Sequence, residues 1–250
     1  MKLPVLSLIL LLLASFHAHS EEKAPQCFEL RTYHAFEGKL AALHARFNDH
    51  TLDLFQKHGM THVAYWTPLE NEPQTLVYLL AYPDRAAREA SWKAFLADPV
   101  WQAAKAESEK DGKLVAKIES LFLHPTDYSP KTALAGEGHV FEMRHYTTLP
   151  GKLDALDARF RDHTIGLFTK HGMTNLPYFH LDEGQEGAGT TLLYFLAHAS
   201  REDRDASFQA FRSDPDWIAA RDASEKDGKI LIENGVVSTL LLPTNYSPMQ

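Results

Sequence analysis

The sequence predicts an α+β protein built from two copies of a β-α-β-β-α-β repeat. The first observation is a duplicated segment, since DHTLDLFQKHGMT at 49–61 returns as DHTIGLFTKHGMT at 162–174. The second is that strand and helix signals follow one another in the same order in both copies. The third is the stretch KTALAGEG at 131–138, which has the composition of a linker. We therefore expect repeats at 27–130 and 139–248, joined by that linker.

Each repeat opens with a strand in which residues of two faces alternate. The first copy reads CFELRTY at 27–33, and the second reads VFEMRHY at 140–146. In the first repeat an amphipathic helix follows Gly38, with apolar residues at helical spacing. Gly59 is placed to take the left-handed conformation that ends this helix.

Two further strands, a second helical region and a last strand complete the repeat. In the first copy these strands are expected at 61–67 and 75–82, and the latter is almost wholly apolar, as a central strand is. In the helical region Asp98 is expected to cap a continuation that starts at Pro99, because proline is accepted in a first helical turn. The last strand is expected near 118–124.

This element order is the ferredoxin-like one. Both helices of such a unit cover the same face of its sheet. The other face must also be covered, and the second copy is the natural cover. We therefore expect the two sheets to pair within one chain into a pseudo-two-fold barrel.

The N-terminus has the three parts of a secretory signal. Lys2 precedes an apolar run at 3–16, and the small residues Ala18 and Ser20 precede Glu21. The run is shorter than the roughly 20 residues that a spanning helix needs. We expect a signal peptide at 1–20 that is cleaved, although a retained anchor is the alternative. The mature protein would then be periplasmic or secreted.

The cysteine count and the net charge limit the partners. Cys27 is the only cysteine, so no internal disulfide can form, and a buried place at the start of its strand is expected. The chain has a formal net charge of −8. Nucleic acids and anionic lipids need clustered positive charge, so neither is expected as a partner. A small molecule is the expected partner, and a higher oligomer stays open.

Several motifs, in the same order in both repeats, resemble the NIPSNAP family. In the first repeat they are ELRTY at 29–33, Gly38, KHGM at 57–60, Tyr82, Arg88 and DPVW at 98–101. In the second they are EMRHY at 142–146, Gly151, KHGM at 170–173, His198 in the place of the tyrosine, Arg204 and DPDW at 214–217. The resemblance covers nearly all of the mature chain and implies a dimeric α/β-barrel fold. It does not imply a reaction.

The polar face of the first strand is the first candidate ligand site. It carries a carboxylate, a guanidinium and a phenol in both repeats: Glu29, Arg31 and Tyr33, then Glu142, Arg144 and Tyr146. We expect the other face to meet the helices and this face to look into the barrel. There it could bind a small polar or anionic ligand, since arginine suits carboxylate and phosphate groups. The alternative is that Glu29 and Arg31 pair with charges across the barrel and Tyr33 only packs.

Histidines are the second candidates. His50 and His163 fall at the spacing of the apolar helix stripe, so each is either a packed core residue or a general base. His58 lies in the last helical turn, where it can cap the helix. His50 and His58 are eight positions apart, roughly 12 Å along a helix, which is too far to share one metal ion. No metal and no cofactor is expected, and no residue pattern indicates a haem.

Three functions remain open at this stage. The first is a barrel that binds a small ligand. The second is a cofactor-independent enzyme, monooxygenase-like or isomerase-like, with His50 or His163 as base. The third is a module that binds another protein through its helices. A barrel filled by side chains would favour the third.

Overall fold

The computed structural model describes residues 27–70, 74–130 and 139–250. The expected signal at 1–20 and linker at 131–138 lie outside the described residues. The first repeat consists of β1 (Cys27–Ala35), α1 (Leu40–Arg46), the π-helical turn η1 (Phe47–Thr51), α2 (Leu52–Lys57), β2 (Thr61–Pro68), β3 (Thr75–Tyr82), α3 (Arg85–Ala97), α4 (Pro99–Ser108) and β4 (Val115–Pro125). The second consists of β5 (Val140–Thr148), α5 (Leu153–Arg159), η2 (Phe160–Thr164), α6 (Ile165–Lys170), β6 (Thr174–Leu181), β7 (Thr191–His198), α7 (Arg201–Ser213), α8 (Pro215–Ser224) and β8 (Leu231–Pro243).

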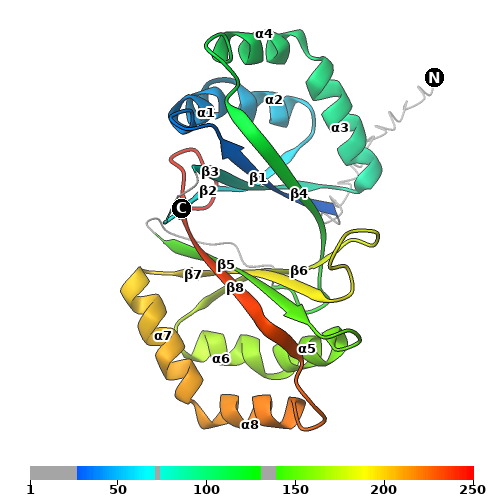
Figure 1. Ribbon diagram of the computed structural model, residues 1–250, viewed down its shortest axis with the longest axis vertical. Helices are drawn as coiled ribbons and strands as arrows, with labels where there is room; N and C mark the ends of the chain where they lie inside the picture. The colour runs from blue at the N-terminus through cyan, green and yellow to red at the C-terminus, as the bar shows by residue number, and fades with distance from the viewer. Residues whose placement is uncertain (1–26, 71–73, 131–138) are drawn as a thin grey trace, which may run out of the picture.

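The strands of the described residues close into one barrel in the order β1-β3-β2-β8-β5-β7-β6-β4. Each repeat supplies four neighbouring strands, and the two sheets join where β2 pairs with β8 and where β4 pairs with β6. Figure 1 shows the helices of the two repeats at opposite ends of the molecule, with the sheets facing each other between them. The predicted fold, two β-α-β-β-α-β repeats in an intrachain barrel, is confirmed.

Apolar side chains from both repeats fill the barrel interior. Leu30, Trp66 and Phe195 belong to this cluster, and the Trp66 and Phe195 rings stack 5.1 Å apart. Because side chains alternate along a strand, Glu29 and Arg31 point to the opposite face, toward the helices. The prediction that this polar face looks into the barrel is therefore wrong. The closed interior holds the apolar residues, whereas the helix side offers hydrogen-bonding partners for the charged ones.

A second apolar layer lies between each sheet and its helices. In the first repeat it includes Phe55, Tyr78 and Phe95, with the Phe55 and Phe95 rings 4.9 Å apart. Strand β3 is buried along its whole length, as expected of a central strand. Cys27 is buried at the start of β1, also as expected.

A π-helical turn interrupts the first helix of each repeat. Hydrogen bonds in such a turn run from residue i to residue i+5, so the turn takes up an extra residue. Thr51 consequently occupies the inward position of η1, where it is buried and its hydroxyl donates to the Arg46 carbonyl at 3.0 Å. His50 is exposed, and so is His163 in η2. The prediction that these histidines lie on the packed helix stripe is wrong for this reason.

The helix ends follow the sequence signals. Gly59 has a φ of +76°, the left-handed conformation expected after α2. The Asp98 carboxylate accepts from the Val100 N–H at 2.8 Å and so caps α4, with Pro99 in the first turn. The same carboxylate lies 2.8 Å from His58 Nε2, which ties the end of α2 to the start of α4.

The tail of the second repeat packs on the first. The Thr244 N–H donates to the Tyr65 carbonyl at 2.9 Å, and the Ser247 hydroxyl accepts from the Tyr65 N–H at 3.0 Å. The Tyr246 hydroxyl lies 2.7 Å from His44 Nδ1, and its ring packs edge-on to that of Tyr65.

The first repeat packs its own tail on the second in the same way. The Thr126 N–H donates to the Tyr178 carbonyl at 2.9 Å, and the Tyr178 N–H donates to the Ser129 hydroxyl at 2.9 Å. The Tyr128 hydroxyl donates to Asp157 at 2.6 Å. The repeats are therefore joined in two ways: their sheets pair edge to edge, and each repeat packs its tail on the other. No helix in the described residues is both long and apolar enough to cross a membrane.

We expect Tyr246→Ala to lower the free energy of unfolding by about 3 kcal/mol, because it removes a large ring from the contact between the repeats. Chemical denaturation should still give one transition, since each repeat depends on the tail of the other. The neighbouring exposed Asn245→Ala is the control and should change stability by less than about 0.5 kcal/mol. Two separate transitions in the wild type would contradict this interdependence.

Candidate functional site

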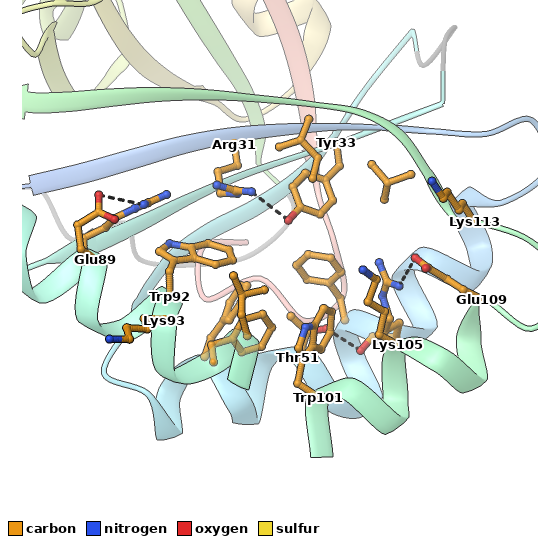
Figure 2. Close-up of a pocket in the computed structure, with 18 residues that line it drawn as sticks. Arg31, Tyr33, Thr51, Glu89, Trp92, Lys93, Trp101, Lys105, Glu109 and Lys113 are labelled. Atoms are coloured by element: carbon orange, nitrogen blue, oxygen red, sulfur yellow. Dashed lines mark hydrogen bonds and ion pairs between the residues drawn. The ribbon is translucent and has the colours of Figure 1, made fainter. Parts of the chain in front are cut away.

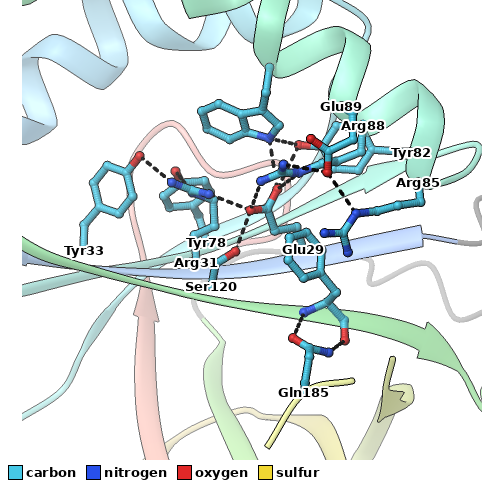
Figure 3. Close-up of polar contacts among 12 residues, drawn as sticks. Glu29, Arg31, Tyr33, Tyr78, Tyr82, Arg85, Arg88, Glu89, Ser120 and Gln185 are labelled. Carbon is cyan, nitrogen blue, oxygen red and sulfur yellow. Dashed lines mark hydrogen bonds and ion pairs between the residues drawn. The ribbon is translucent and has the colours of Figure 1, made fainter. Parts of the chain in front are cut away.

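A buried carboxylate joins β1 to α3 and β4 in the first repeat (Figure 3). Glu29 is fully buried and accepts from Arg88 Nη2 at 2.6 Å and Arg88 Nε at 2.9 Å. Arg31 Nη1 donates to it at 2.5 Å, the Ser120 hydroxyl at 2.6 Å and the Trp92 indole at 3.0 Å. Both carboxylate oxygens are thus enclosed by donors from three elements.

Arg31 is itself held in one orientation. Its Nε donates to the Tyr78 hydroxyl at 2.9 Å and its Nη2 to the Tyr33 hydroxyl at 3.2 Å. Its guanidinium carbon lies 4.3 Å from the centre of the Trp92 ring, within cation–π distance. The guanidinium edge is thus bonded to strand residues, and its face meets Trp92 of α3.

The Glu29 carboxyl stays ionised down to low pH. Burial raises its pKa, but the hydrogen bonds from Arg88 and the charge of Arg31 outweigh burial. The pKa therefore falls from its ordinary value of 4.5 to about 2.

The second repeat builds the same network with two replacements. Glu142 accepts from Arg204 at 2.7 and 3.0 Å, from Ser238 at 2.5 Å and from Arg144. His198 Nε2 lies 3.1 Å from the carboxylate, at the position that Tyr82 holds in the first repeat. In the other replacement, Phe208 stands in the place of Trp92. The smaller ring has no indole N–H donor.

A cavity of about 640 Å³ lies beside the first of these networks, between the sheet and the helices (Figure 2). Arg31 and Tyr33 reach it from β1, and Val115 and Ile118 of β4 border it. Its volume is that of a cavity for a small organic molecule. The aromatic residues that line it are Phe47, Phe55, Trp92, Phe95 and Trp101.

Charged side chains surround this aromatic centre. Six of the lining residues are cationic and two are anionic, which gives a formal charge of +4 (6 − 2): Arg31, Arg46, Arg88, Lys93, Lys105 and Lys113 against Glu89 and Glu109. Figure 2 shows Lys105, Glu109 and Lys113 at one end of the cavity and Glu89 and Lys93 at the other.

The structure places the predicted polar-face residues next to this cavity, but on the helix side of the sheet. Arg31 and Tyr33 line the cavity, and Glu29 lies behind them, bound to Arg31 and Arg88. The alternative of charge pairing holds only in part, because Glu29 pairs with Arg31 and Arg88 of its own repeat and not with charges across the barrel. The second set pairs in the same way, since Arg144 donates to Glu142 and, at 3.0 Å, to the Tyr146 hydroxyl.

Sequence reasoning missed most of the cavity. Arg88 was noted only as a family motif, and Arg46 and Thr51 were not singled out. One available signal was their presence in both copies, as Arg204, Arg159 and Thr164. Of the lysines at the cavity ends, Lys113 has this signal, as Lys229, whereas Gln209 stands opposite Lys93.

The histidine candidates do not meet this cavity. Its described lining includes no histidine, and His50 is exposed on the other side of the π turn from Thr51. His163 borders a separate surface hollow with Asp162, Gly166 and Lys170. His58 caps α2, as the sequence indicated, and bonds Asp98.

We expect Glu29→Gln to destabilise the protein by about 3 kcal/mol at pH 7, because it leaves two arginines facing a neutral group. A depressed pKa adds stability that is fully present above pH 5 and lost as the pH falls from about 4.5 toward about 2. Urea denaturation between pH 7 and pH 3 should therefore show a shallower loss of stability in Glu29→Gln than in the wild type. Parallel curves for the two proteins would contradict the network, and the exposed Glu233→Gln serves as control.

Comparisons with known proteins agree with this architecture. A family model described as NIPSNAP matches residues 28–130 and 141–248. Among solved structures, an uncharacterized NIPSNAP domain protein from Burkholderia xenovorans is 27% identical, with a TM-score of 0.38, over 42% of this chain and 99% of its own. No curated protein is significantly similar to the chain.

Two larger structures match almost the whole chain. One, from Fusobacterium nucleatum and described as a "putative monooxygenase", is 12% identical with a TM-score of 0.57 over 91% of this chain and 99% of its own. Another with the same description, from Lactobacillus acidophilus, is 11% identical with a TM-score of 0.52 over 90% of this chain and 99% of its own. At these identities the likeness shows the fold alone. The two family matches, by contrast, cover most of the sequence, and the chain belongs to the NIPSNAP family, with two NIPSNAP domains in tandem.

Proposed function

We propose that this protein binds a small organic molecule in the cavity between the sheet and the helices of its first repeat. The observation that carries the proposal is the cavity of about 640 Å³, with an aromatic lining and buried arginines at its wall. An apolar aromatic surface combined with polar groups that are held in place is typical of ligand sites. The barrel interior is a less suitable site, because a cluster of apolar side chains occupies it.

The enzyme alternative uses the same cavity. The description of two structural neighbours as monooxygenases keeps oxygenation under consideration, although their likeness extends only to the fold. A general base would have to come from the described lining, where Tyr33, Glu89 and Glu109 are the available groups and the predicted histidines are not. Binding therefore has the stronger support. The filled barrel interior is the outcome expected of a protein-interaction module. Ligand binding is nevertheless preferred, because the helix side of the first repeat carries a cavity of its own.

Export belongs to the same proposal. The N-terminal run of apolar residues followed by Ala18 and Ser20 supports a cleaved signal and a periplasmic or secreted protein. A ligand of this protein would then be taken from outside the cytoplasm. Determination of the N-terminal residue of protein from its own host tests this point.

Filling the cavity tests the proposed site. We expect Val115→Trp, at the cavity border, to abolish retention of any small molecule that the wild type captures from an extract of its host. Leu231→Trp, at the matching position of the second repeat, is the control and should retain that molecule. Mass spectrometry of re-isolated proteins measures the outcome. Equal recovery from Val115→Trp and the wild type would place the ligand elsewhere.

The histidine hypothesis predicts that removing these histidines weakens binding, and the structure predicts that it does not. Because His50 and His163 are exposed and absent from the described cavity lining, their replacement by alanine should leave the captured amount unchanged. A loss of more than about tenfold in affinity, roughly 1.4 kcal/mol, would restore them as site residues.

A further inference from the structure

We infer that the ligand of the first-repeat cavity is an amphipathic aromatic anion, a flat apolar body that carries one acid group. The inference rests on the proposed binding function of that cavity and names the class of its ligand. It is drawn from the charges at the two ends of the cavity, the state of Arg46 and the aromatic centre.

The cavity lining is positively charged, in contrast to the chain as a whole. The lining carries +4 (6 − 2), whereas the whole chain carries −8. Including Glu29, which lies behind Arg31, still leaves +3 (4 − 1). An acidic protein that gathers positive charge around one concave site attracts anions there and repels cations.

Part of this positive charge is not neutralised by carboxylates of the protein. Lys93, Lys105 and Lys113 are exposed, and no ion pair joins any of them to another described residue. In the second repeat the position of Lys105 is held by Arg221, which pairs with Asp222 at 2.7 Å. At this position the first repeat thus keeps a cation without an ion pair, whereas the cation of the second repeat is paired.

Arg46 lies at the end of the cavity that holds Lys105 and Lys113, and it offers a hydrogen-bond donor to a ligand there. Arg46 is buried, and its Nη1 donates to Glu109 at 2.9 Å and Ser108 at 3.3 Å. Its Nε–H is also buried but has no acceptor among the described residues, as is true of its counterpart Arg159, and only Arg46 lines the described cavity. A buried donor without a partner is costly, and a carboxylate, sulfonate or phosphate oxygen would satisfy it. The acid group of the ligand is therefore assigned to this end.

The aromatic centre defines the rest of the ligand. Trp92 and Trp101 line the cavity, as Figure 2 shows, and Phe47, Phe55 and Phe95 complete the apolar surface. Flat rings gain from stacking on such side chains beyond the area that they bury. A small inorganic anion would leave this surface in contact with water.

Two dyes that differ by the acid group test the inference on the full chain. They are 8-anilinonaphthalene-1-sulfonate and the uncharged N-phenyl-1-naphthylamine, titrated while their fluorescence is followed. We expect the sulfonate to bind once per chain and at least tenfold more tightly than the neutral dye. The double variant Lys105→Gln/Lys113→Gln should weaken the sulfonate at least fivefold and the neutral dye less than twofold.

A matched variant controls for the overall charge. Lys226→Gln/Lys229→Gln removes the same two charges from the exposed surface of the second repeat and should leave both dyes unaffected. Val115→Trp should abolish binding of both dyes. Ile118→Trp replaces it if the first variant fails to fold, because Ile118 borders the cavity but is 48% exposed.

The outcomes separate the inference from the function on which it rests. If the neutral dye binds as tightly as the sulfonate and the Lys105→Gln/Lys113→Gln variant changes nothing, the cavity is a ligand site but the anionic class is wrong. If neither dye binds, or if both bind unchanged to the cavity-filling variant, the proposed site itself fails.

Discussion

The buried Glu29 carboxylate is the interaction on which the helix side of the first repeat depends. It accepts hydrogen bonds from Arg31 of β1, Arg88 of α3 and Ser120 of β4. A carboxylate in such a place would be strongly destabilising without these partners, so the strand, the helix and the edge of the sheet are fixed relative to one another. The same contacts orient Arg31 over Trp92, and these two side chains form one wall of the cavity. Structural support and a binding surface thus share one network.

Duplication explains why the chain contains two such networks and how they could diverge. Each repeat needs the other, because the tails of both are exchanged and the strands form a single barrel. The sites on the helix sides, by contrast, lie at opposite ends of the molecule (Figure 1). A replacement such as His198 for Tyr82, or Phe208 for Trp92, changes one site without touching the other. The first repeat could therefore specialise while the second kept the architecture.

The fold could be predicted because its signals are local and occur twice. Strand alternation, the glycine after α2 and the Asp98 cap each depend on a few neighbouring residues. The face of β1 that meets the helices could not be predicted in this way. Alternation groups Glu29 with Arg31, but only the closed barrel decides which face excludes water. The π turn could not be predicted either. The segment DHT fits an α-helix in which His50 faces inward, but the π turn takes up one extra residue and places Thr51 in that inward position.

The candidate site was predicted in part, for the same reason. Arg31 and Tyr33 were found because they lie on one strand. Arg46, Arg88 and Lys105 come from three different helices, and their convergence is a property of packing that no local pattern contains. The most direct test of the central claim is a crystal structure of the chain with 8-anilinonaphthalene-1-sulfonate. We expect the dye between the sheet and the helices of the first repeat, with its sulfonate within hydrogen-bond distance of Arg46. Density for the dye inside the barrel, or only on the outer surface, would contradict it.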